Sequence, residues 1–134
     1  MSERFRLVVA GTRTITDGDV VIDAIERSQF PFPDAQIVTG GAPGVDTIAR
    51  DHANDTPGAS SIVFTADWQT YGDRAGPIRN REMAAYGDGL VAVWDGASRG
   101  TRSMINAALD APIPVEVTLV DPPTLADFGG GADA

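Results

Sequence analysis

Five short apolar runs recur along the chain, and each is rich in valine, isoleucine or other side chains that favour strands. Continuous apolar runs of this length indicate strands that are buried on both faces of a parallel sheet. The predicted strands span residues 5–10, 35–39, 61–64, 89–94 and 115–120.

Amphipathic segments separate these runs. Residues 17–28, 44–54 and 101–109 carry apolar side chains at helical spacing, and a further helix is expected through residues 82–85, after a long loop over residues 65–77. The alternation of strands and helices predicts an α/β fold. We expect a single Rossmann-like domain with a five-stranded, mostly parallel sheet in the order 3-2-1-4-5 and helices on both faces.

The length of 134 residues fits one domain, which we expect to cover residues 1–120. Residues 121–134 contain two prolines and a run of three glycines, which predicts a disordered C-terminal tail. The chain has no cysteine and His52 is its one histidine, so no metal site is expected. No long apolar stretch suits a signal peptide or a membrane span, and a cytoplasmic location without a membrane partner follows as the default.

The charge balance is strongly acidic, with ten basic and nineteen acidic residues and a net charge of −9. Every basic residue is an arginine. Such a surface should repel phosphate backbones, so nucleic acid is disfavoured as a partner. The acidity favours adaptation to a halophilic, high-salt cytoplasm over recognition of a basic partner, because salt screens the self-repulsion.

Glycine-rich turns follow three of the predicted strands, and in two of them a helix starts at once. The unpaired amides of a helix start attract anions, and glycine lets a phosphate approach them. The alternative is that these are ordinary tight turns, with Asp46 and Ser98 as helix caps. The candidate ligand-binding residues are Gly11, Thr12, Arg13, Gly40, Gly41, Ala42, Gly44, Asp46, Arg79, Asn80, Asp95, Gly96, Ser98, Gly100 and Thr101.

Several other side chains have two readings each. Arg13 could clamp a phosphate or be a solvated loop charge. Arg79 is expected at a helix start, where the dipole disfavours a positive charge, and this favours a ligand role. Trp68 and Tyr71 could cover a base or form a small satellite core. Trp94 is expected in the core, and His52 is expected to be a packing or surface residue.

The motifs together resemble one known family. The runs that carry the resemblance are residues 8–13 and 38–46, Asp67-Trp68, residues 75–83 with Gly76-Pro77-Ile78-Arg79-Asn80, and residues 94–101. They are similar to the YspA-like branch of the SLOG superfamily, which groups DprA/Smf proteins with LOG enzymes. This resemblance implies a Rossmannoid domain that binds a nucleotide or a nucleotide derivative such as ADP-ribose, with no separate cofactor. It also implies that the chain can form a homo-oligomer.

LOG enzymes cleave the N-glycosidic bond of nucleotides with an arginine and a glutamate. Arg79 stands where the resemblance places that arginine, but Arg102, Ser103 and Met104 follow Thr101 where the glutamate is expected. Asp95 or Asp46 could supply a carboxylate instead, so Arg79, Asp95 and Asp46 are the tentative catalytic residues. We therefore expect a nucleotide-binding or sensing domain. A nucleotide N-glycosidase or ADP-ribose hydrolase is the alternative, and a DprA-like nucleic-acid-handling protein is a weaker one.

Overall fold

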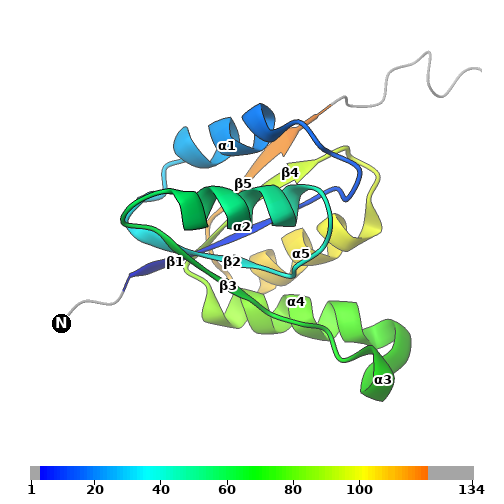
Figure 1. The fold of residues 1–134 in the computed structure, drawn as a ribbon. Coiled ribbons are helices and arrows are strands. Elements are labelled where there is room, and N and C mark those ends of the chain that lie inside the picture. Colours follow the sequence, from blue (N-terminus) through cyan, green and yellow to red (C-terminus); the bar gives the residue numbers. More distant parts are fainter. Residues whose placement is uncertain (1–3, 121–134) are drawn as a thin grey trace, which may run out of the picture.

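The computed structural model describes residues 4–120, and their fold is built on one five-stranded sheet (Figure 1). All neighbouring strands are parallel and the order is β3-β2-β1-β4-β5. The predicted α/β class and strand order are confirmed, and the sheet is fully parallel. The strands are β1 Phe5–Gly11, β2 Ala35–Thr39, β3 Ser60–Val63, β4 Gly89–Trp94 and β5 Val115–Leu119.

Helices cover both faces of the sheet, as predicted. The first pair, α1 (Gly18–Glu26) and α2 (Val45–Asp55), lies on one side, and α4 (Ala75–Tyr86) and α5 (Arg99–Asp110) lie on the other (Figure 1). Successive side chains of a strand point to opposite faces, so each central strand supplies both cores. In β1, Leu7 and Val9 pack towards α1 and α2, whereas Val8 and Ala10 pack towards α4 and α5.

The segment over residues 65–77 differs from the predicted loop. It contains the short helix α3 (Trp68–Tyr71) and the 3₁₀ turn η1 (Gly72–Arg74), and α4 then begins at Ala75. Pro77 lies in the first turn of α4, where its missing N–H leaves no helical hydrogen bond unmade. Because the helix starts early, Arg79 lies more than one turn inside it instead of at its start.

The winding of the sheet reverses at β1. The chain passes from β1 outward through β2 to β3, and then crosses to β4 and β5 on the other side of β1. In open α/β sheets such a switch point leaves a crevice at the carboxyl ends of the strands. The loops after β1, β2 and β4 therefore meet at one edge of the sheet, as the sequence predicted.

No helix within residues 4–120 combines the length and apolar character needed to cross a bilayer. The predicted C-terminal tail, residues 121–134, lies outside the described residues.

Candidate functional site

A cavity of about 500 Å³ opens at the carboxyl ends of β1, β2 and β4. Its walls come from the loops after these strands and from residues of α3, α4 and α5. Most of the predicted ligand-binding residues meet here. Those that line the cavity are Gly11, Arg13, Gly40, Gly41, Ala42, Asp46, Arg79, Asn80, Ser98, Gly100 and Thr101. The predicted residues that do not line it are Thr12, Gly44, Asp95 and Gly96.

Asp46, in the first turn of α2, holds the loop that follows β2. Its Oδ2 accepts hydrogen bonds from the backbone amides of Gly40 at 3.1 Å and Ala42 at 3.2 Å. The residue is only 6% exposed, and this burial raises the pKa of its carboxyl from 3.8 to about 6, against the opposing effect of the two amides and of Arg79 and Arg13. The amides that glycine was expected to offer to a phosphate are thus partly occupied by the protein's own carboxylate.

Arg79 crosses from α4 to the end of β2. Its Nη1 donates to the carbonyl oxygen of Gly40 at 3.0 Å, and its Nε donates to Oδ1 of Asn80 at 3.1 Å. Burial lowers the pKa of Arg79, and Asp46 partly offsets this effect. An arginine nevertheless stays protonated at neutral pH, so Arg79 brings a fixed positive charge to the cavity wall.

Asn80 joins α4 to α5 behind this arginine. It is 4% exposed, and its Nδ2 donates to Oγ of Ser103 at 3.0 Å and to the carbonyl oxygen of Gly100 at 3.5 Å. Asn80 therefore fixes the position of the first turn of α5 relative to Arg79.

Asp95 and Thr12 shape the loop after β4 from outside the cavity. Oδ1 of Asp95 accepts from the amides of Ala97 and Ser98, both at 2.8 Å, and these bonds hold the pKa of its carboxyl below the usual value. The amide of Asp95 itself donates to Oγ1 of Thr12 at 3.1 Å. Asp95 therefore has a loop-forming role. Of the two tentative catalytic carboxylates, Asp46 is the one that lines the cavity.

The start of α5 presents unused backbone donors to the cavity. Ser98 precedes the helix, and the amide of Arg102 makes the first helical bond, to the carbonyl of Ser98. The amides of Arg99, Gly100 and Thr101 therefore have no helical acceptor. A Cβ built on Gly100 would meet no atom within 4 Å, so the approach to these amides is open.

The other glycines of the site serve packing. A Cβ on Gly11 would lie 2.3 Å from the carbonyl oxygen of Val93, and one on Gly40 would lie 2.5 Å from Nη1 of Arg79. Gly44 has φ +78°, and a Cβ there would lie 2.4 Å from the carbonyl oxygen of Arg13. These contacts allow the loops after β1 and β2 to cross closely, which is a reason for glycine that involves no ligand.

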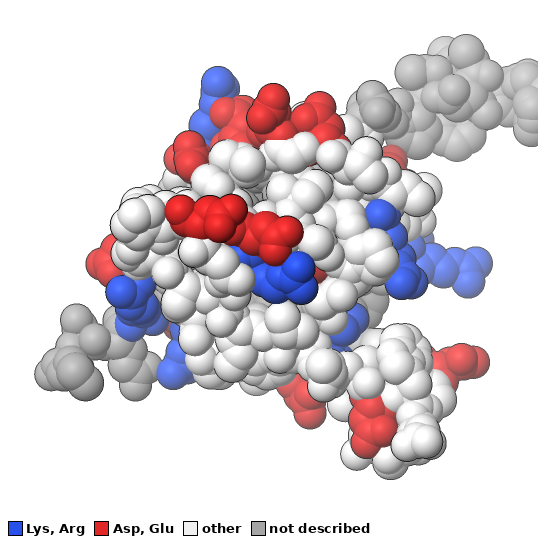
Figure 2. Space-filling view, in the orientation of Figure 1, with Lys and Arg blue, Asp and Glu red and all other residues white. Residues whose placement is uncertain are grey.

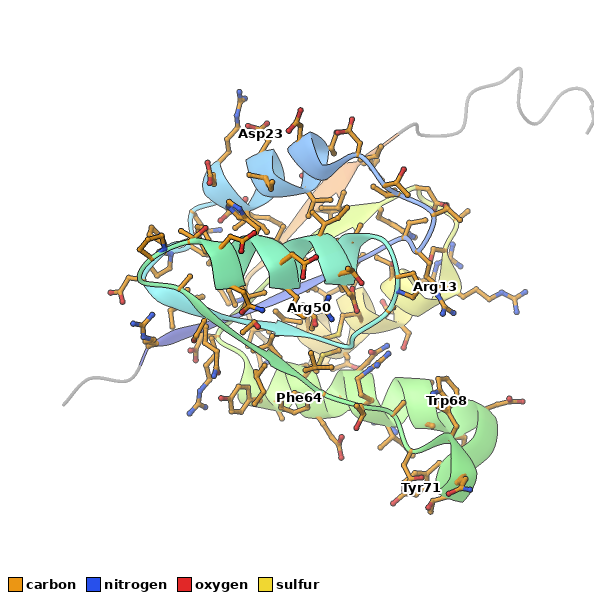
Figure 3. All side chains as sticks on the ribbon, viewed as in Figure 1. Arg13, Asp23, Arg50, Phe64, Trp68 and Tyr71 are labelled. Atoms are coloured by element: carbon orange, nitrogen blue, oxygen red, sulfur yellow. The ribbon has the colours of Figure 1, made fainter. Side chains whose placement is uncertain are left out.

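The aromatic residues of α3 are exposed. Trp68 is 60% and Tyr71 is 43% exposed, so they do not form a satellite core. Figure 3 shows both on the α3 turn at one end of the molecule. Trp68 lines the cavity, and a Cβ built on Gly76 would lie 3.4 Å from its ring, whereas Tyr71 is not part of the lining.

Of the predictions for Trp94 and His52, the first is wrong and the second is confirmed. Trp94 is half-buried at the end of β4, where its Nε1 donates to the carbonyl of Ser98 at 3.0 Å, so it is not a core residue. His52 lies away from the cavity, bonded to Glu26 at 3.0 Å and stacked on Phe32 with ring centroids 5.2 Å apart. His52 is therefore a packing residue, as expected.

The local charge of the cavity is opposite to that of the whole chain. Its lining holds three arginines (Arg13, Arg79 and Arg99) and one acid, Asp46. Figure 2 shows acidic side chains over α1 and α2 and arginines at the edge where Figure 3 labels Arg13. No group of three or more histidine, aspartate or glutamate side chains suited to a metal ion occurs within residues 4–120.

The fold and the site define a Rossmann-like α/β protein with an arginine-bearing cavity at its topological switch point. The sequence model of the YspA, cpYpsA-related SLOG family matches residues 5–71. The Gene 61 protein of Mycobacterium phage D29 is 35% identical over 120 residues, covering 82% of this chain and 93% of the phage protein. The chain therefore belongs to the YspA, cpYpsA-related SLOG family.

A solved structure has the same fold. DNA processing protein A from Helicobacter pylori, described for its single-stranded DNA binding mode, matches with a TM-score of 0.65 and 22% identity. The match covers 97% of this chain and 71% of the other chain. At this identity the likeness shows a shared fold.

The expectation that nucleic acid is disfavoured as a partner is corrected by this comparison. A protein with this fold binds single-stranded DNA. The inference from net charge also fails physically, because a ligand responds to the potential of the surface that it meets. Here three arginines line the cavity, and the face in Figure 2 shows acidic side chains over α1 and α2.

Sequence reasoning missed several parts of the cavity wall. The lining residues that were not among the predicted ligand-binding residues include Gly76, Pro77, Met83, Arg99 and Met104. The motif Gly76-Pro77-Ile78-Arg79-Asn80 carried the signal for the α4 wall, because it is the most distinctive run of the chain. For Met83 and Met104 the sequence offers no signal, since buried methionines look like ordinary core residues.

Proposed function

We propose that the cavity binds a nucleotide or nucleotide derivative, with its phosphate at the start of α5. The observation that carries this proposal is the first turn of α5. It offers the amides of Arg99, Gly100 and Thr101 to the cavity, with no side chain at Gly100 to block them. Unpaired amides at a helix start favour anions. Arg13 and Arg79 add positive charge on the same cavity wall.

The exposed ring of Trp68 supports a ligand that carries a base. It lies on the wall formed by α3 and α4, and a large aromatic ring left 60% exposed beside a cavity is available for stacking. The cavity volume of about 500 Å³ lies within the range of small-molecule sites.

A charge introduced at Gly100 tests this proposal. Gly100→Glu places a carboxylate in front of the α5 amides, in space that no protein atom fills. Acidic residues are tolerated in the first turn of a helix, so the fold should be retained. Binding of AMP and of ADP-ribose, measured by calorimetry, should weaken by at least about tenfold, or ~1.4 kcal/mol.

The matched control is Gly18→Glu. Gly18 is also in the first turn of a helix, α1, and a Cβ there also meets no atom within 4 Å, but it does not line the cavity. This variant should bind both probes like the unsubstituted protein. Equal affinities in the two variants would refute the placement of the phosphate at α5.

A second candidate function is the binding of single-stranded nucleic acid. The shared fold with DNA processing protein A and the three arginines of the cavity favour it. Anisotropy of a labelled oligonucleotide should then rise on adding the protein, and the affinity should fall steeply with salt because the release of counterions becomes less favourable. Binding without salt dependence would count against it.

A third candidate is N-glycosidase activity, which Asp46 favours as the carboxylate on the cavity wall beside Arg79. A carboxylate close to the sugar could stabilise an oxocarbenium-like transition state. Release of free base from AMP by the purified protein, lost in Asp46→Asn, would establish this activity. Its absence after long incubation would leave the domain as a binding module.

A further inference from the structure

Asp46 has one carboxylate oxygen committed to the fold and one that has no protein partner. Oδ2 takes the amides of Gly40 and Ala42, and no donor bonds to Oδ1 within residues 4–120. The residue is 6% exposed and lines the cavity, where it is the one carboxylate that the described residues contribute to the wall. Oδ1 is not among the buried polar atoms left without a partner, so this oxygen is open to the cavity and can accept a hydrogen bond from a ligand there.

The neighbouring cations do not satisfy this oxygen. Arg79 directs its Nη1 to the carbonyl of Gly40 and its Nε to Asn80, and no arginine of the described chain lies within ion-pair distance of Asp46. Arg79 and Arg13 act on the carboxylate only through space. Oδ1 is therefore left available to a donor group of a ligand in the cavity.

The chemistry of a carboxylate selects the part of a nucleotide that can lie here. An ionised carboxylate only accepts hydrogen bonds. A phosphate has no donor to give and would be repelled by the like charge, whereas the sugar hydroxyls are neutral donors. The end of β2 is thus suited to the sugar, and the start of α5 is suited to the phosphate.

The spacing of the strands agrees with this division. Asp46 follows β2 and the α5 amides follow β4, with β1 between them. Two inter-strand spacings amount to about 10 Å. A ribose 5′-phosphate that makes a hydrogen bond at each end can span this separation.

We propose that Oδ1 of Asp46 accepts a hydrogen bond from the ribose 2′-hydroxyl of the bound nucleotide, which makes the cavity selective for ribonucleotides over 2′-deoxyribonucleotides. This inference rests on the proposed nucleotide binding and adds the sugar to it. Asp46 acts as a specificity-determining residue, and the bond to the 2′-hydroxyl is absent with a deoxyribonucleotide.

The test compares four ribonucleoside monophosphates with their 2′-deoxy counterparts by calorimetry at pH 8, where Asp46 is ionised. The unsubstituted protein should bind the ribonucleotide of the preferred base about ten- to one-hundredfold more tightly, the range for a hydrogen bond to a charged group. Asp46→Asn should lose most of this preference through weaker ribonucleotide binding, with little change for the deoxy form.

The matched control is Asp51→Asn on the same helix, because the Asp51 side chain is 58% exposed and pairs with Arg50. It should keep the full preference. Should Asp46→Asn fail to fold, the ribose-to-deoxyribose ratio of the unsubstituted protein decides alone.

The outcomes separate the two proposals. Equal binding of both sugars by the unsubstituted protein overturns the role of Asp46 and leaves nucleotide binding intact. If Asp46→Asn loses the same affinity for ribonucleotides and deoxyribonucleotides, the role of Asp46 is also overturned, because Asp46 would then act only by holding the Gly40–Ala42 loop. Binding of none of the eight nucleotides, and of no ADP-ribose, would refute the proposed function itself.

Discussion

Asp46 combines an organising role with a cost to stability. Its carboxylate holds the loop after β2 through two amides, yet burial disfavours the charged form more than these bonds favour it. A buried carboxylate that lines a cavity and has a raised pKa is a candidate for a functional role. The ligand-binding role that we infer for Asp46 is of this kind.

The raised pKa of Asp46 predicts a pH dependence of stability. Below about pH 4 the Asp46 carboxyl is protonated in both the folded and the unfolded state, and its contribution to the free energy of unfolding is fully present. Between pH 4 and about pH 6 the folded state binds more protons than the unfolded chain. The free energy of unfolding therefore falls as pH rises through this window, by up to ~3 kcal/mol from this group.

Urea denaturation from pH 4 to pH 7 checks this prediction through Asp46→Asn. The free energy of unfolding of this variant, minus that of the unsubstituted protein, should increase as pH rises, because the amide of the variant does not titrate. Asp51→Asn serves as the reference, since its exposed side chain should leave the curve nearly unchanged. Parallel curves for Asp46→Asn and the unsubstituted protein would contradict the assignment.

At the scale of elements, the site depends on how closely the loops after β1 and β2 approach each other. Gly44 ends the second loop just before α2, and its backbone lies against the carbonyl groups of Thr12 and Arg13. The same approach brings Arg13 and Asp46 to one cavity. The contact between the loops is therefore part of the construction of the site.

Gly44→Ala should destabilise the protein more than Gly58→Ala. Both positions have positive φ, +78° and +94°, so each alanine meets backbone strain of about 1–3 kcal/mol. At Gly58 the nearest atom to a Cβ is 3.9 Å away, but at Gly44 it is the carbonyl oxygen of Arg13 at 2.4 Å. The difference in melting temperature between the two variants measures the loop contact, and equal values would contradict it.

At the scale of the whole molecule, two features of charge act separately. The net charge of −9 makes the surface of the protein repel itself. The three arginines of the cavity wall attract an anionic ligand. On the face in Figure 2, acidic side chains lie exposed over α1 and α2, where salt can screen them.

Salt should therefore stabilise the protein while it weakens binding of an anion. If the acidity is a halophilic adaptation, the melting temperature should fall when salt is lowered from about 1 M to about 0.1 M, as screening is lost. Calorimetric scans across this range check it. A melting temperature that does not change with salt would rule out the adaptation.

The sequence by itself determined the elements and their order. The apolar runs and helical spacing depend on which local positions are buried, so they predicted five strands and four of the helices. The order 3-2-1-4-5 was predicted from the Rossmann-like topology that this alternation of strands and helices indicates. The glycine-rich turns after three of these strands predicted where the cavity lies. The short helix over Trp68–Tyr71 was missed, because four residues are too few to show a periodicity.

Only the tertiary structure decided what each side chain of the site does. Asp46 and Asp95 look alike in sequence, but one lines the cavity and the other fixes a loop outside it. The space beside Gly100 at the start of α5 is open, whereas the space beside Gly40 is occupied by the side chain of Arg79, which comes from a helix distant in the sequence. The gathering of arginines in an acidic chain was equally hidden. The physical reason is that hydrogen-bond partners, burial and local potential depend on groups far away in the chain, which local patterns do not encode.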